Sequence, residues 1–179
     1  MPGIQSRAPD GKAWTFKEMI QGKPLGHPSH AMVVHFPVAF YIGAFAFDIT
    51  SRIGHFPQMP LMATWLILGA FVGSVFAVTT GLVDYFSMVP GSTKRRWATR
   101  HLIFQLLAFA FFAINFAVRW KHRGFGESKS LWIGIGFVGV VLLSVGQWLG
   151  GVLVYDLGMR VSTAEKGEAA RQKQEPTAG

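Results

Sequence analysis

The sequence predicts an all-α integral membrane protein, a bundle of four transmembrane helices. Half of the 179 residues are hydrophobic and only 15% are charged, a balance too apolar for an ordinary soluble domain. Residues 61–83 and 131–154 contain no charged side chain, and each stretch is long enough to cross a hydrocarbon core about 30 Å thick as a helix. These stretches also lack the alternation of polar and apolar residues that a membrane β-barrel requires.

Four helical crossings are expected along the chain, because backbone groups without hydrogen-bond partners are costly in lipid. The predicted crossings cover residues 31–49, 61–86, 101–118 and 131–155. The loops between them are short, and short loops make successive helices antiparallel neighbours. We therefore predict an up-down four-helix bundle.

The distribution of basic residues predicts the orientation of this bundle. With four crossings both termini and the second loop share one side, which carries twelve of the 17 lysines and arginines. The positive-inside rule then places both termini in the cytoplasm. The predicted division of the chain is a cytoplasmic, interfacial N-terminal segment (1–25), a transmembrane domain (26–158) and a flexible cytoplasmic tail (159–179).

Composition and motifs exclude several functions. The chain has no cysteine, which excludes disulfides, thiolate iron–sulfur ligation, thioether-linked haem and thiol nucleophiles. Its net charge of +8 is explained by membrane topology and anionic lipid, and no nucleic-acid-binding motif is present, so we expect no nucleic-acid partner. No hydrolase, phosphate-loop or zinc-protease motif occurs, so no catalytic residue is predicted; whether the protein is an enzyme is open, with a non-catalytic subunit favoured.

The stretch GHPSHAMVVHFP, residues 26–37, holds three of the six histidines. His27 precedes a proline and is expected at the cap of the first crossing. On a straight helix His30 and His35 lie about 140° apart, too far round to bind one ion together. Unless Pro37 distorts this turn, His35 is expected to find its partner on another helix.

His101 opens the third crossing and is the expected partner of His35. The first and third crossings both start on the cytoplasmic side, so these two histidines are predicted at similar depths. We expect them to be the axial ligands of a b-type haem between the two helices, with Asp84, Gln105 and Gln147 bonding the remaining ring N–H groups.

Three functions are compatible with these residues. The first is an electron-transfer subunit that carries haem b and exchanges electrons with quinone. The second is a structural or assembly subunit of a larger membrane or redox complex without a cofactor, in which the histidines cap helices. The third is a metal or proton pathway lined by histidines, namely His27, His30, His35 and His101.

Small and polar residues within the crossings predict helix contacts. The second crossing carries a stripe of Gly69, Gly73, Ala77 and Gly81, and the fourth carries Gly146 and Gly150. Such stripes indicate close packing of helices or, alternatively, room for a flat cofactor. Asp48 is expected to pair with Arg52 one turn on, and Asn115 to bond between helices.

Three stretches carry a resemblance: GHPSHAMVVHFP, GLVDYF and QWLGGVLVYDLGMRV. Together they resemble a bacterial four-helix membrane family catalogued as domain of unknown function 2231, over roughly residues 25–161. The resemblance implies the bacterial inner membrane, and members fused to Rieske-type iron–sulfur domains imply redox work, although the family has no assigned activity. Ala31 and Gln147 depart from its usual proline and glycine. The matching residues are His27, Pro28, His30, His35, Phe36, Pro37, Gly81, Asp84, Tyr85, Trp148, Leu149, Gly150, Gly151, Val154, Tyr155, Gly158 and Val161.

Overall fold

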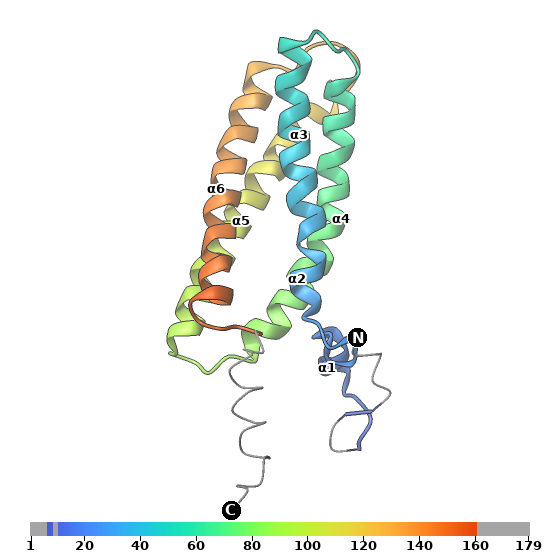
Figure 1. Ribbon diagram of the computed structural model, residues 1–179. Coiled ribbons are helices and arrows are strands. Elements are labelled where there is room, and N and C mark those ends of the chain that lie inside the picture. The colour runs from blue at the N-terminus through green and yellow to red at the C-terminus, as the bar shows by residue number, and fades with distance from the viewer. Residues whose placement is uncertain (1–6, 9–10, 161–179) are drawn as a thin grey trace, which may run out of the picture.

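The structure is a computed structural model that describes residues 7–8 and 11–160. Every regular element in these residues is helical (Figure 1). The elements are α1 (Phe16–Ile20), the 3₁₀ turn η1 (Lys23–Leu25), α2 (Ser29–Val33), α3 (His35–Ile53), α4 (Met59–Phe86), α5 (Thr93–Trp120) and α6 (Ser130–Tyr155).

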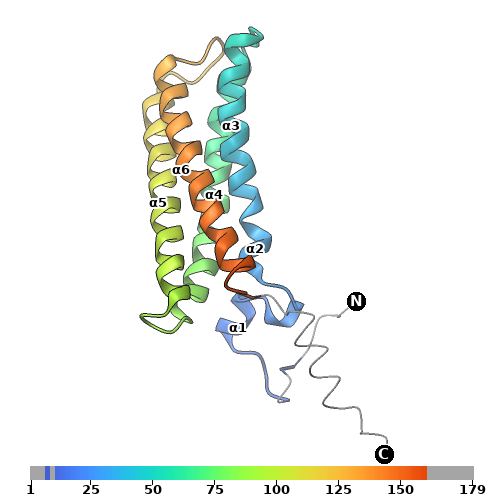
Figure 2. The same cartoon turned by 60° about the vertical axis from the view of Figure 1, so that its left-hand side comes forward.

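The long helices form two antiparallel hairpins that pack side by side. The N-terminal hairpin consists of α2, α3 and α4, and the C-terminal hairpin of α5 and α6 (Figures 1 and 2). Four helical segments, with α2 and α3 counted together, are long and apolar enough to cross a membrane. The predicted all-α fold with four membrane-crossing helices is thus confirmed.

The packing order places the first and third crossings diagonally opposite one another. Helix α3 packs against α4 and α6, and α5 packs against the same two helices. Helix α1 and the C-terminal end of α6 lie at the same end of the bundle, here called the α1 end (Figure 1). The α3–α4 and α5–α6 loops lie at the opposite end, here called the far end.

Helix α5 begins at Thr93, about two turns before the predicted start of the third crossing. Ser92 caps it, its hydroxyl oxygen accepting a hydrogen bond from the backbone N–H of Arg95 at 3.2 Å. A side-chain cap satisfies one of the orphan donors at a helix start. The basic segment KRRWATR, residues 94–100, is therefore helical, whereas the predicted crossings left it in the second loop.

The first crossing is interrupted between α2 and α3. Helix α2 ends at Val33 and α3 begins at His35, with Val34 in a turn between them. Pro37 has no N–H to give the Val33 carbonyl, and its ring crowds the preceding turn. The interruption thus falls in the turn before Pro37, where the sequence left a distortion open.

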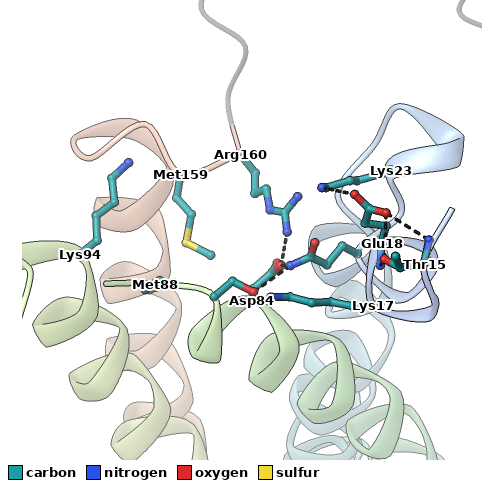
Figure 3. A pocket seen from close by; sticks show the side chains of 11 residues that line it. Thr15, Lys17, Glu18, Lys23, Asp84, Met88, Lys94, Met159 and Arg160 are labelled. Atoms are coloured by element: carbon teal, nitrogen blue, oxygen red, sulfur yellow. Dashed lines mark hydrogen bonds and ion pairs between the residues drawn. The ribbon is translucent and has the colours of Figure 1, made fainter. Parts of the chain in front are cut away.

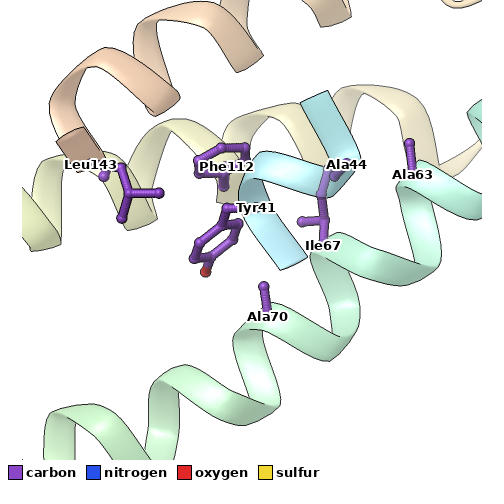
Figure 4. Close-up of a cluster of buried hydrophobic side chains, with 8 residues drawn as sticks. Tyr41, Ala44, Ala63, Ile67, Ala70, Phe112 and Leu143 are labelled. Carbon is purple, nitrogen blue, oxygen red and sulfur yellow. The ribbon is translucent and has the colours of Figure 1, made fainter. Parts of the chain in front are cut away.

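The core in the middle of the bundle combines small and large side chains (Figure 4). Tyr41 of α3 and Phe112 of α5 stack with ring centroids 4.1 Å apart. Alanines of α3, α4 and α5 in this core let the helices approach closely, as is typical of membrane helix packing. The buried members of the core are Tyr41, Ala44, Ala63, Ile67, Ala70, Ala108, Phe112 and Leu143.

Several glycines of the predicted stripes accommodate side chains of neighbouring helices. A β-carbon on Gly73 would lie 3.1 Å from Pro37, and one on Gly69 would lie 3.2 Å from the Phe40 ring. These positions fit the helix-contact interpretation of the stripe.

Candidate functional site

Two histidines face each other across the bundle toward the α1 end. His30 comes from α2 and His101 from α5, and their ring centroids are 6.5 Å apart with the ring planes 88° to one another. Both rings are partly buried. The pair therefore links α2 of the N-terminal hairpin to α5 of the C-terminal hairpin, across the diagonal of the bundle.

Each of these rings is fixed by a backbone carbonyl of the helix beside it. Nδ1 of His30 lies 2.9 Å from the carbonyl oxygen of Ala77, and Nδ1 of His101 lies 2.7 Å from that of Gly146. A carbonyl oxygen only accepts, so these partners assign the proton to Nδ1 in both rings. Nε2 of each neutral imidazole then keeps its lone pair, the form that binds a metal.

A glycine lies against each ring, one helical turn after the carbonyl that holds it. A β-carbon on Gly81 would lie 2.9 Å from Cε1 of His30, and one on Gly150 would lie 3.1 Å from Cε1 of His101. Contacts this short force a neighbour to shift. Both glycines thus make room for an imidazole.

The two hairpins present these histidines in equivalent positions. The accepting carbonyls and the glycines of α4 and α6 are offset by 69 residues: Ala77 matches Gly146, and Gly81 matches Gly150. On the first helix of each hairpin, α2 with α3 in one and α5 in the other, matching positions are 71 residues apart. Matching residues contact each other at three depths in the bundle. These contacts are His30 with His101, Tyr41 with Phe112, and Asp48 with Arg119. The arrangement is a pseudo-two-fold axis running along the bundle.

The expected pairing of His35 with His101 is wrong. His35 is exposed, and its nearest hydrogen-bond partner is the carbonyl oxygen of Met32, 3.4 Å from Nδ1. The buried positions of α3 recur every three or four residues, and the same spacing extended backwards reaches His30 rather than His35. These buried positions are Pro37, Tyr41, Ala44, Asp48 and Ser51.

His27 is also outside the pair. It is exposed and lies one residue before the N-cap of α2, which is Pro28. Neither His27 nor His35 is in contact with the ring of His101, so of the histidines predicted as ligands the structure brings only His30 and His101 together.

None of Asp84, Gln105 and Gln147 is the partner of a ring Nδ1–H group, since backbone carbonyls bond both Nδ1 atoms. Gln105 lies one turn after His101 on α5, and its amide nitrogen is buried without a hydrogen-bond partner among the residues described. Gln147 is partly buried on α6 and follows Gly146, whose carbonyl holds His101.

Asp84 joins α4 to the segments at the α1 end. Its carboxylate accepts hydrogen bonds from Gln21 at 3.2 Å and from Arg160, with which it forms an ion pair. An open pocket of about 510 Å³ surrounds it, and Figure 3 shows Arg160 and Lys17 extending toward the carboxylate. Four basic side chains line this pocket: Lys17, Lys23, Lys94 and Arg160.

Glu18 holds α1 in place beside this pocket. It accepts hydrogen bonds from the backbone and hydroxyl of Thr15, at 3.1 Å and 2.8 Å, and forms an ion pair with Lys23 at 2.8 Å. The hydrogen bond from Lys23, followed by those from Thr15, lowers the pKa of Glu18 to about 2. The short helix thus has a complete capping box.

A buried ion pair lies near the far end. Asp48 of α3 pairs with Arg119 of α5, and their side chains are 1% and 0% exposed. Asp48 therefore does not pair with Arg52 as expected; Arg52 instead donates to the carbonyl of Ser128 at 2.6 Å. Both side chains are buried within the helical bundle, where an unpaired charge is costly, and this favours a specific partner.

Further hydrogen bonds complete this cluster. The Ser128 hydroxyl donates to Asp48 at 2.6 Å, and Nε of Arg119 donates to the side-chain oxygen of Asn115 at 2.9 Å. Asn115 in turn donates to the carbonyl of Trp132 at 2.9 Å, which confirms its predicted bond between helices. The network joins α3, α5, α6 and the loop that precedes α6.

Four membrane-crossing helices with paired polar groups buried at both ends define a multi-pass membrane protein. The family model described as predicted membrane protein (DUF2231) matches residues 26–163. The chain belongs to this family, as the sequence motifs indicated. No curated protein and no solved structure matches it.

Proposed function

We propose that this protein is a membrane electron-transfer subunit that binds b-type haem between its first and third transmembrane helices, with His30 and His101 as axial ligands. The observation that carries the proposal is the distance between their rings. Two imidazoles bonded at about 2 Å to opposite sides of one metal ion have ring centres roughly 6 Å apart. The observed separation of 6.5 Å is close to this value.

The donor set favours haem over a bare metal ion. A bare ion needs about four protein ligands or more, whereas a porphyrin supplies four ligands itself and needs only axial ones. Among the residues described, no group of three or more histidine or acidic side chains is placed to hold a metal. The buried, unpartnered amide of Gln105, one turn from His101, is a further polar group available to a ligand at this site.

Ligation by two histidines supports electron transfer rather than catalysis at the iron. Haem iron bound in this way passes single electrons between its ferric and ferrous forms. Because His30 and His101 would both hold the iron, the protein would leave no ligand position on it for a substrate or oxygen. The positive-inside rule puts the α1 end, and with it the histidine pair, near the cytoplasmic leaflet, where we propose that quinone exchanges electrons with the site.

An optical spectrum of the detergent-purified full-length chain tests this proposal. We expect a Soret band and reducible α and β bands in the wild type, lost in His30→Ala and His101→Ala. The matched controls His35→Ala and His27→Ala, both at exposed positions, are expected to keep them. A colourless protein with bound metal would favour the metal pathway, and a colourless, metal-free one the structural or assembly subunit.

The orientation has its own test, because the chain contains no cysteine. Single-cysteine variants Lys94→Cys and Lys129→Cys carry a thiol at exposed positions near opposite ends of the bundle. With both termini in the cytoplasm of a bacterial cell, a membrane-impermeant maleimide labels Lys129→Cys in intact cells and spares Lys94→Cys. The reverse pattern would contradict this orientation.

A further inference from the structure

The Asp48–Arg119 pair has a feature that stability alone does not explain. Nη1 of Arg119 is buried and has no hydrogen-bond partner among the residues described. Removing two charges from water costs free energy, and an ion pair that leaves one donor unsatisfied recovers only part of that cost. Well-packed apolar residues in place of a buried ion pair often stabilise a protein as much as the pair does. The pair is therefore better explained by specificity than by stability.

The pseudo-two-fold axis indicates which specificity is involved. Two hairpins related by such an axis meet through an isologous type of interface, in which equivalent positions touch. An interface of this kind also allows like hairpins from two copies of the chain to pair with each other. At the other equivalent contacts, like pairing would join two histidines or two aromatic rings, both of which are tolerable.

At the third contact, like pairing is unfavourable. Two N-terminal hairpins would bring two Asp48 carboxylates together, and two C-terminal hairpins would bring two Arg119 guanidinium groups together. Both residues are almost fully buried, so neither repulsion would be screened by solvent. Only an N-terminal hairpin with a C-terminal hairpin pairs opposite charges at this depth.

We propose that Asp48 and Arg119 are the specificity-determining contact of the bundle, which selects pairing of the two unlike hairpins of the chain over pairing of like hairpins from two copies. Ser128 and Asn115 support this contact by holding the carboxylate and the guanidinium in place. The same choice of partner brings His30 to His101. The proposal does not depend on whether haem is bound.

Charge exchange in the full-length chain tests the proposal. Two differently tagged copies are co-expressed, extracted in mild detergent and scored for the fraction of one tag that co-purifies with the other. Arg119→Asp and Asp48→Arg each place like charges at the contact and are expected to lower the yield of folded protein at least about tenfold. The double exchange, Asp48→Arg with Arg119→Asp, is expected to restore most of that yield.

A neutral double variant separates specificity from stability. Asp48→Asn with Arg119→Gln removes both charges, so we expect it to fold and its differently tagged copies to co-purify severalfold more than wild-type copies. For the charge-reversal variant Arg119→Asp the matched control is Lys121→Asp, the same reversal at an exposed position near the far end, which is expected to keep the wild-type yield.

Two results would overturn the proposal: a double exchange as damaged as the single variants, or a neutral double that co-purifies no more than wild type. A colourless protein would refute the haem site and leave this test unaffected, because yield and co-purification are measured without reference to the cofactor.

Discussion

Replacing Gly81 with alanine tests how tightly α4 holds His30. The new β-carbon would lie 2.9 Å from Cε1 and 3.1 Å from Nδ1 of the ring. The ring cannot turn away without losing the 2.9 Å hydrogen bond from Nδ1 to Ala77. Relieving the contact therefore requires His30 or α4 to move.

The size of the effect follows from three opposing contributions. Alanine favours the helical state over glycine by about 1 kcal/mol. Overpacking by a methyl group typically costs about 1–3 kcal/mol, and a weakened hydrogen bond costs about 1 kcal/mol more. We therefore expect Gly81→Ala to destabilise the protein by about 1–3 kcal/mol.

The matched control is Gly134→Ala in α6, where no heavy atom beyond the adjoining backbone of α6 lies within 4 Å of the new β-carbon. There only the helix preference remains, so this variant is expected to be as stable as wild type or up to about 1 kcal/mol more stable. Unfolding in mixed detergent micelles measures both. Equal stability of Gly81→Ala and Gly134→Ala would refute the close contact between Gly81 and His30.

Two further predictions concern the α1 end. Asp84→Asn weakens the bonds to Gln21 and Arg160 and is expected to lower the free energy of unfolding by about 1–3 kcal/mol in the same assay. The control Asp156→Asn, at an exposed position, is expected to be neutral. An equal effect of the two variants would contradict the role of Asp84. For Glu18, a pKa lowered from 4.5 to about 2 means that its contribution is complete above pH 4.5 and is lost as the pH falls toward 2. Hydrogen exchange of α1, corrected for intrinsic rates, is expected to rise over this range in wild type but not in Glu18→Gln, and a pH-independent wild type would contradict it.

The fold was predictable because apolar runs without charges have few alternatives in lipid. Helical crossings follow from the need to satisfy backbone groups, and antiparallel neighbours follow from short loops. The start of α5 was missed because the charges of KRRWATR suggested a loop. The cap at Ser92, which makes this segment helical, was present in the sequence as a serine followed three residues later by Arg95.

The candidate site was predictable in part. His101 and the pairing of the first and third crossings followed from depth counting, but the choice between His30 and His35 depended on which face α2 turns inward. The recurrence of inward positions from Pro37 to Ser51 points to His30, and extending it backwards would have found the partner.

The far-end pair was missed for a different reason. Asp48 has an arginine one turn away in sequence, Arg52, and local pairing is the simpler expectation. Asp48 instead points into the bundle and meets Arg119, 71 residues later. Such a contact follows from the pairing of the two hairpins, which local sequence does not specify.

The electron paramagnetic resonance spectrum of oxidised, full-length protein tests His30 and His101 as axial ligands most directly. If both histidines bound a haem iron with their ring planes at 88°, two iron d orbitals would be nearly equal in energy, and the low-spin ferric signal would be strongly anisotropic. We expect this signal in wild type and in His35→Ala, and its loss in His30→Ala and His101→Ala. No haem signal in wild type, or a signal that survives His30→Ala and disappears in His35→Ala, would contradict the assignment.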